Sequence, residues 1–191
     1  MLTPRHEAVR LAPALGAEVR GVDMLALCDQ DRDFLRKAWA DHMVIVVRGF
    51  PALTAQQHID FCRTFGEIGA RVRPAEARHE PEGAPAEVMY VSNKRVNGRI
   101  IGSIPDGEME GHIDQSYMER PGKGTCLHAL EVPRAGGDTM FGNLCMAADT
   151  LPADLRRAVS RRKVVNAYGR SEEHTSELQS HLNLVCRLLL E

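Results

Sequence analysis

The sequence predicts a β-rich α+β domain, arranged as a sandwich or a barrel. Short apolar segments rich in β-branched residues alternate with segments of helical periodicity. Gly and Pro separate these segments at short intervals along most of the chain. A length of 191 residues fits one domain, or one domain with an appendage, and a hydrophobic content of 43% is enough to form its core.

The first third of the chain predicts two strands and two helices. Residues 17–22 predict a short strand. Residues 29–43 predict a helix, because acidic residues come first and apolar residues then recur on one side. Residues 44–48 (VIVVR) predict a buried strand from their β-branched content. Residues 54–65 predict a second helix, because a Thr followed three residues later by Gln is a capping-box signature.

The remainder of the chain mixes shorter strands with turns and helices. Pro, Ala and charged residues mark a surface loop, and Gly and Pro pairs mark the turns. We expect a loop at 70–87, strands at 88–92, 125–132 and 163–168, a hairpin-like excursion at 93–109, a tight turn at 133–138, and helices at 147–151 and 152–162.

Net charge and cysteine usage narrow the functional classes. The net charge of -2 gives no electrostatic reason to expect a nucleic-acid or an anionic-membrane partner. The longest strongly apolar run, at 43–47, is too short to span a bilayer, and the N-terminus lacks the apolar core of a signal peptide. The five cysteines are scattered without a C-x-x-C motif, which predicts reduced, mostly buried thiols in a cytoplasmic protein.

The tripeptide His-Ile-Asp occurs twice, and its two copies have different predicted backbones. The first copy (His58, Asp60) lies within a predicted helix, where residues two apart point about 200° from each other. We interpret it as a solvated helix face. The second copy (His112, Asp114) stands between Pro- and Gly-rich breaks and is predicted to be extended, which puts both side chains on one side. An imidazole and a carboxylate that face one point can be two ligands of a metal ion, if the surrounding sequence supports it.

The second copy opens a longer motif. Residues 112–152 read HIDQSYMERPGKGTCLHALEVPRAGGDTMFGNLCMAADTLP. In order and spacing they resemble the TauD/TfdA family pattern: H-T/S-D, a strand ending in E-x-P, then G-G-D/N-T-x-F/W, and a short helix ending in L-P. Upstream, HMVIVVRGFPALTAQQHIDFCRTFGEIG resembles the N-terminal region of the same family. The resemblance extends over about residues 10–169.

Several expectations follow from this resemblance. The family fold is a double-stranded β-helix, a jelly roll with flanking helices. Its iron(II) is held by two His and one carboxylate, and 2-oxoglutarate and O2 are co-substrates. The resemblance makes His112 and Asp114 the first two iron ligands and catalytic residues, and Thr139 a hydrogen-bond donor to a 2-oxoglutarate carboxylate. It implies hydroxylation of a small, often anionic molecule. Asn93 could face the site from its strand, or lie on the surface.

The sequence departs from the family pattern near the metal motif. Family members carry bulky aromatic residues just before the metal His, whereas Glu110 and Gly111 stand there in this chain. Members that use sulfonates place a His shortly after F-G-E, and this chain has none, so taurine is not implied. Arg71 or Arg73 is a candidate partner of an anionic substrate, with a solvated surface position as the alternative.

We expect the C-terminal end of the chain not to follow the sequence pattern of the family. Members place a further His, and then an Arg that binds 2-oxoglutarate, well beyond the first motif, and we expect this chain to lack both. Residues 170–180 (RSEEHTSELQS) resemble a translated sequencing-adapter oligonucleotide, although a natural C-terminal helix is the alternative. We therefore expect 1–169 to be the N-terminal portion of a TauD/TfdA-like dioxygenase domain, an incomplete jelly roll, and 170–191 to be an appended tail. Such a chain is expected to fold poorly and to be inactive.

Two other functions stay open at this point. A jelly-roll relative without catalysis would bind a small molecule or a partner without iron. A metal-dependent hydrolase would use His112 and Asp114 with a His of the tail, and its activity would not need 2-oxoglutarate. Assembly of the intact parent protein into a homo-oligomer is also left open.

Overall fold

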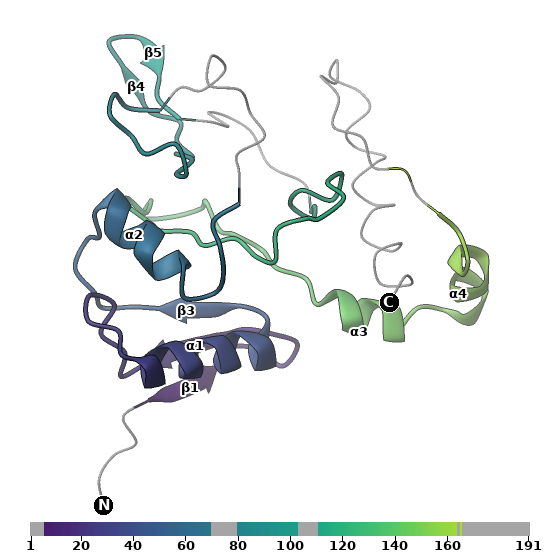
Figure 1. Ribbon diagram of the computed structural model, residues 1–191. Helices are drawn as coiled ribbons and strands as arrows, with labels where there is room; N and C mark the ends of the chain where they lie inside the picture. The colour runs from purple at the N-terminus through teal and green to yellow at the C-terminus, as the bar shows by residue number, and fades with distance from the viewer. Residues whose placement is uncertain (1–5, 70–79, 103–110, 164, 166–191) are drawn as a thin grey trace, which may run out of the picture. The chain divides into compact units, whose positions relative to one another are not determined.

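The computed structural model describes residues 6–69, 80–102, 111–163 and 165 (Figure 1). The chain divides into two compact units, one of Met1–Leu11 with Gly16–Glu108 and one of Ala12–Leu15 with Met109–Glu191. The first unit contains helices and short strands, whereas the described residues of the second form only helices and irregular chain. In the described ranges, no helix has the length and apolar character that crossing a bilayer requires.

The first unit contains a three-stranded sheet (Figure 1). Strand β1 (Glu7–Arg10) pairs antiparallel with β2 (Ala17–Arg20), and β2 pairs parallel with β3 (Ile45–Val47). Strands β2 and β3 confirm the predictions at 17–22 and 44–48, although both are shorter than expected. The sequence pattern does not predict β1, whose extended conformation is supported by its pairing with β2.

Helix α1 (Asp29–His42) packs against β2 and β3 and confirms the predicted first helix. Its buried positions Asp31, Leu35 and Ala38 are three and four residues apart, which is the spacing of one helix face. Burying a leucine side chain such as Leu35 contributes about 1.5–3 kcal/mol. The centre of the core is formed by Val19, Leu35 and Ala38, and the half-buried side chains around it are Ala8, Val22, Leu27, Phe34, Ile45, Val47, Phe61 and Phe65.

The N-terminal end of α1 is joined to the chain that precedes β1. Asp31 has no exposed surface, and its Oδ2 accepts a hydrogen bond of 2.8 Å from the backbone N–H of Cys28. Its Oδ1 lies 2.5 Å from Nε2 of His6, whose ring stacks on Phe34 with the ring centroids 4.9 Å apart. A buried carboxylate is tolerated when its oxygens are paired, so this network holds the start of β1 beside α1.

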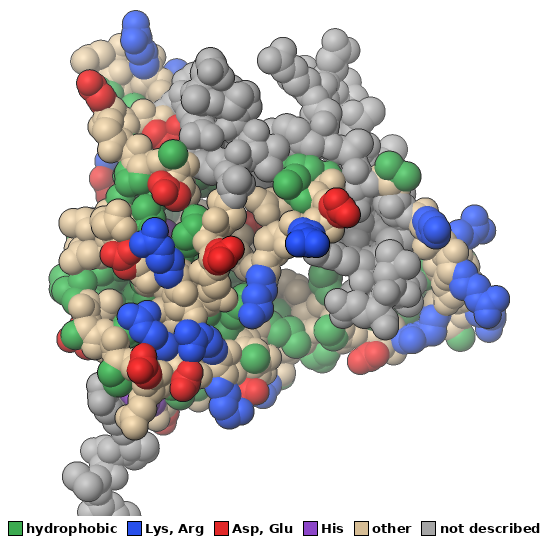
Figure 2. Space-filling model, viewed as in Figure 1, with side chains coloured by type: hydrophobic (Ala, Val, Ile, Leu, Met, Phe, Trp, Pro, Cys, Tyr) green, Lys and Arg blue, Asp and Glu red, His purple; other side chains and the backbone are tan. Residues whose placement is uncertain are grey.

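Charged side chains of both signs are interspersed on the face drawn in Figure 2. On β2, Glu18 accepts a hydrogen bond of 2.8 Å from Nε of Arg20, and Nε of Arg48 lies 3.4 Å from the same carboxylate. The hydrogen bond from Arg20 is the main cause that holds the pKa of Glu18 below its usual value. Because folding lowers this pKa, the small stabilisation is present near neutral pH and is lost as the pH falls through the folded-state pKa.

Strands β4 (Arg95–Val96) and β5 (Arg99–Ile100) form an antiparallel hairpin. The two residues between them, Asn97 and Gly98, have φ angles of 51° and 76°. Two consecutive positive φ angles are typical of a type I′ turn, and Asn-Gly is the pair that adopts them with least strain. The hairpin-like excursion expected at 93–109 is therefore confirmed over its described part.

The second unit contains α3 (Leu144–Asp149) and α4 (Ala153–Val159), which confirm the two helices predicted in this region. Helix α3 begins earlier than predicted, because Oδ1 of Asn143 accepts a capping hydrogen bond of 3.0 Å from the N–H of Met146. Nδ2 of the same Asn143 donates a hydrogen bond of 2.7 Å to the carbonyl of Ala14. A single amide side chain thus joins the short segment at the start of this unit to its first helix.

The α+β class is confirmed, but the β-rich part of the prediction is corrected, because the described residues contain more helix than strand. The segments at 88–92 and 125–132, which were predicted to be strands, are irregular apart from an isolated bridge at Val91. A strand needs a neighbouring strand for its backbone hydrogen bonds, and strand propensity alone does not provide one. Most of the strand predicted at 163–168 lies outside the described residues.

Cysteine exposure also differs from the prediction. The four described cysteines are free thiols. Their side chains are not mostly buried: two are exposed and two are half-buried, namely Cys28 and Cys145, and Cys62 and Cys126.

Leu35→Ala is expected to lower the free energy of unfolding of the first unit by about 2–5 kcal/mol, because it leaves a cavity under α1. The single tryptophan, Trp39, lies on the same helix with its ring 5.4 Å from that of Phe65, so its fluorescence reports urea unfolding of this unit. Leu25→Ala is the matched control, since Leu25 is 49% exposed. We expect that control to change stability by no more than about 0.5 kcal/mol. Equal losses in the two variants would contradict the assigned core.

Candidate metal site

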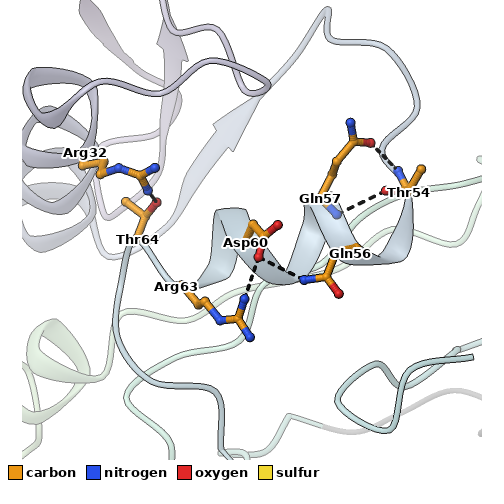
Figure 3. Close-up of polar contacts among 7 residues, drawn as sticks. All are labelled: Arg32, Thr54, Gln56, Gln57, Asp60, Arg63 and Thr64. Atoms are coloured by element: carbon orange, nitrogen blue, oxygen red, sulfur yellow. Dashed lines mark hydrogen bonds and ion pairs between the residues drawn. The ribbon is translucent and has the colours of Figure 1, made fainter.

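The first His-Ile-Asp copy lies on helix α2 (Ala55–Cys62), as predicted. The predicted capping box is present (Figure 3). Oγ1 of Thr54 accepts a hydrogen bond of 3.2 Å from the N–H of Gln57, and Oε1 of Gln57 accepts one of 2.8 Å from the N–H of Thr54. Two backbone donors at the start of the helix are thereby satisfied.

The carboxylate of Asp60 in this copy accepts hydrogen bonds on the helix surface. Its Oδ1 accepts hydrogen bonds from Nε2 of Gln56 at 3.0 Å and from Nη1 of Arg63 at 2.6 Å (Figure 3). Both partners are neighbours at helical spacing. His58, two residues before Asp60, is directed to another side of the helix by the same geometry. Exposed Asp60 agrees with the interpretation of the first copy as a solvated helix face, whereas half-buried His58, whose Nε2 has almost no exposed surface, corrects it.

The segment after α2 is tied to α1 through Thr64, which is 2% exposed. Oγ1 of Thr64 accepts a hydrogen bond of 2.9 Å from Nη1 of Arg32 (Figure 3), and its carbonyl accepts one of 2.7 Å from Nε of Arg36. The polar residues around α2 therefore hold this helix in the first unit.

The second His-Ile-Asp copy brings its two polar side chains together. Nε2 of His112 lies 3.1 Å from Oδ1 of Asp114. The backbone is neither helix nor strand at this point, and a turn begins at Asp114. The side chains of His112 and Asp114 are 43% and 57% exposed, so solvent reaches the pair. The two side chains lie close together as predicted, but the predicted extended backbone is corrected, because no strand forms here and a turn begins at Asp114. The role of the two residues as ligands stays a prediction.

The separation of the two donor atoms suits two adjacent ligands of a six-coordinate ion. Ligands about 2.1 Å from an ion and at right angles to each other lie about 3.0 Å apart. An imidazole nitrogen and a carboxylate oxygen are also donors that iron(II) accepts. Without a metal ion, the imidazole of His112 can instead donate a hydrogen bond to the carboxylate of Asp114. This requires the tautomer that carries its proton on Nε2.

Asp114 has a further polar neighbour that sequence reasoning missed. Oγ1 of Thr125 donates a hydrogen bond of 2.6 Å to Oδ2 of Asp114, from eleven residues further along the chain. The loop between them is closed by Gln115, whose Oε1 accepts a hydrogen bond of 3.0 Å from the N–H of Gly122. No helix or strand period relates positions this far apart, so no sequence signal could have identified the contact.

The other predicted site residues lie in exposed irregular chain or outside the described residues. Thr139 is exposed and lies in irregular chain of the second unit. Asn93 belongs to the first unit, and Glu110, Arg71 and Arg73 lie outside the described residues. In the part of the chain that the structure describes, no group of three His, Cys, Asp or Glu side chains is placed to hold one metal ion.

A protein-family model matches residues 7–184 of the chain, and the family is described as taurine catabolism dioxygenase TauD, TfdA family. The chain belongs to the TauD/TfdA family. The matched range of this TauD/TfdA chain includes helix α2, the His112 and Asp114 pair, and the G-G-D-T segment that contains Thr139.

Curated proteins and a solved structure are similar to this TauD/TfdA chain over most of its length. Pentalenolactone F synthase of Streptomyces arenae is 31% identical over 177 residues, which cover 89% of this chain and 57% of that protein. The (S)-phenoxypropionate/alpha-ketoglutarate-dioxygenase of Sphingobium herbicidovorans is 31% identical over 168 residues, covering 83% and 52%. The crystal structure of a taurine dioxygenase from Burkholderia xenovorans has a TM-score of 0.58 and 26% sequence identity, and covers 82% of this chain and 52% of that one.

The TauD/TfdA chain spans about half the length of the curated relatives it matches. The family match runs to residue 184 and thus includes part of the segment 170–191, which lies outside the described residues. The division into a dioxygenase portion at 1–169 and an appended tail at 170–191 stays a prediction.

Thr54→Ala is expected to lower the free energy of unfolding by about 1 kcal/mol, because the N–H of Gln57 loses its side-chain acceptor. Urea unfolding followed by Trp39 fluorescence measures the loss. Thr54→Ser keeps the hydroxyl and is expected to retain most of the stability. A Ser variant as unstable as the Ala variant would show that the hydroxyl of Thr54 does not stabilise α2.

Proposed function

We propose that the protein is an iron(II)- and 2-oxoglutarate-dependent dioxygenase that hydroxylates a small, anionic organic molecule. The observation that carries the proposal is the 3.1 Å separation of His112 Nε2 and Asp114 Oδ1 in a chain of the TauD/TfdA family. The names of several relatives support 2-oxoglutarate as the co-substrate, because they contain the synonym alpha-ketoglutarate. One is the alpha-ketoglutarate-dependent 2,4-dichlorophenoxyacetate dioxygenase of Cupriavidus pinatubonensis, which is 29% identical over 76% of this chain.

In this proposal His112 and Asp114 hold the iron(II) ion through one nitrogen and one oxygen. When bound, the ion supplies the activation of O2, with 2-oxoglutarate as the reductant. Thr139 donates its hydroxyl hydrogen bond to a carboxylate of 2-oxoglutarate. We infer that the chain is the N-terminal part of a double-stranded β-helix, and a third ligand is expected from elsewhere in the whole protein.

The proposed substrate class follows the names of the relatives. One relative acts on (S)-phenoxypropionate, another on 2,4-dichlorophenoxyacetate, and a relative from Saccharomyces cerevisiae on sulfonates. All of these are small molecules with an anionic group, so we expect the substrate to be a small, anionic molecule. The free thiols of the described cysteines support a reducing, cytoplasmic location.

Asp114→Asn is expected to abolish the visible absorption band that the chain forms with iron(II) and 2-oxoglutarate under anaerobic conditions. The reason is that a neutral amide is a poorer iron ligand than a carboxylate. Absorbance titrations with both reagents measure the band. Asp60→Asn makes the same change in the other His-Ile-Asp copy and is expected to leave the band in place. Equal bands in the two variants would contradict the ligand role of Asp114.

The 191-residue chain is expected to show no O2 uptake that depends on 2-oxoglutarate. Fusing residues 1–169 to the C-terminal half of the (S)-phenoxypropionate dioxygenase is expected to restore uptake, because the fusion supplies the later strands and a third ligand. An oxygen electrode measures the rate, and the fusion with Asp114→Asn serves as the inactive control. A folded fusion without uptake, or an Asp114→Asn fusion that is equally active, would count against the dioxygenase assignment.

A further inference from the structure

We propose that Thr125 is a positioning residue of the metal site, whose hydroxyl fixes the carboxylate of Asp114 so that a single oxygen faces the ion. This inference rests on the proposed function, because it takes Asp114 as a ligand. The motif residues that predict the site are His112, Asp114 and Thr139, and Thr125 is not among them.

The contact between Thr125 and Asp114 has the length of a charge-assisted hydrogen bond. Oγ1 of Thr125 lies 2.6 Å from Oδ2 of Asp114. Bonds from a hydroxyl to an ionised oxygen acceptor are typically about 2.5–2.7 Å long. A Thr hydroxyl carries a single proton, so Oγ1 of Thr125 is the donor of this hydrogen bond and Oδ2 of Asp114 is the acceptor.

The two oxygens of Asp114 therefore have different partners. Oδ1 is 3.1 Å from Nε2 of His112, whereas Oδ2 accepts the hydrogen bond from Thr125. A carboxylate held at Oδ2 cannot rotate freely, so it presents Oδ1 from a fixed direction. Coordination through Oδ1 alone would occupy one position on the ion. Coordination through both carboxylate oxygens of Asp114 would occupy two. Partners of this kind orient ligands at metal sites in general.

The loop between the two residues is shaped to bring Thr125 back to Asp114. Gln115 has a φ angle of 55°, and its carbonyl accepts a hydrogen bond of 2.9 Å from the N–H of Met118. Its side-chain Oε1 accepts a hydrogen bond of 3.0 Å from the N–H of Gly122. A Cβ atom at position 122 would stand 2.9 Å from that oxygen, so a larger residue there would displace the end of the Gln115 side chain. The loop therefore has supports of its own besides the hydroxyl of Thr125.

A purely structural role for Thr125 predicts a different outcome from a positioning role. If its hydrogen bond only closed the loop, losing the hydroxyl would lower stability and leave the affinity for a metal ion unchanged. If it orients Asp114, the affinity falls while the fold is retained. Thr125 is exposed, so a side chain of similar size is expected to be tolerated.

The test measures the dissociation constant for Mn(II), an oxygen-stable probe of an iron(II) site, in the full 191-residue chain. The electron paramagnetic resonance signal of free Mn(II) gives the bound fraction during the titration. Thr125→Val replaces the hydroxyl by a methyl group and is expected to raise the dissociation constant about 10- to 100-fold. Thr125→Ser keeps the hydroxyl and is expected to retain the wild-type value.

Thr150→Val is the matched control, because Oγ1 of Thr150 donates its hydrogen bond of 2.8 Å to the carbonyl of Met146 and not to a carboxylate. It is expected to bind Mn(II) as the wild type does. Unchanged affinity in Thr125→Val, or equally weak binding in Thr125→Ser, would overturn the inference. So would loss of the far-ultraviolet circular dichroism spectrum in Thr125→Val, which would assign this residue a structural role.

Asp114→Asn separates this inference from the proposed function. If this variant loses Mn(II) binding while Thr125→Val keeps it, the inference fails and the ligand role of Asp114 stands. Absence of binding by the wild type, or binding that survives Asp114→Asn, would overturn both together.

Discussion

The functional interpretation of this protein depends on a single carboxylate with two different partners. Oδ1 of Asp114 lies beside the imidazole of His112, and Oδ2 accepts a hydrogen bond from the hydroxyl of Thr125. In the proposed metal site Asp114 has to present its donor atom from a fixed direction, and a side chain that is 57% exposed is not held there by packing. Polar contacts must therefore supply the orientation, and the loop that follows Asp114 provides them.

The two His-Ile-Asp copies show how the backbone decides what identical residues can do. On α2, Asp60 accepts hydrogen bonds from Gln56 and Arg63, which lie one helical turn away on either side. In the second copy a turn begins at the aspartate, and the carboxylate meets the histidine of its own tripeptide. The side chains are the same, but the helix separates residues two apart whereas the irregular chain lets them converge.

The two units differ in how far their own residues cover their apolar surface. In the first, α1 encloses a core around Leu35, and the His6 and Asp31 contact joins the helix to the first strand. In the second, Leu127, Val132 and Met140 are 69%, 76% and 92% exposed. Side chains of this size are normally covered, and in the proposed β-helix neighbouring strands would cover them. This chain matches about half the length of its relatives.

Local sequence by itself determined both N-terminal helices, the capping box of α2 and the Asn-Gly hairpin. Each of these depends on interactions between residues a few positions apart, which periodicity and turn chemistry encode. Tertiary structure alone decided that β1 forms, that the segment at 125–132 is not a strand, and that Thr125 reaches Asp114. These outcomes depend on partners distant in sequence, because strand pairing and loop closure bring together groups that no local pattern relates.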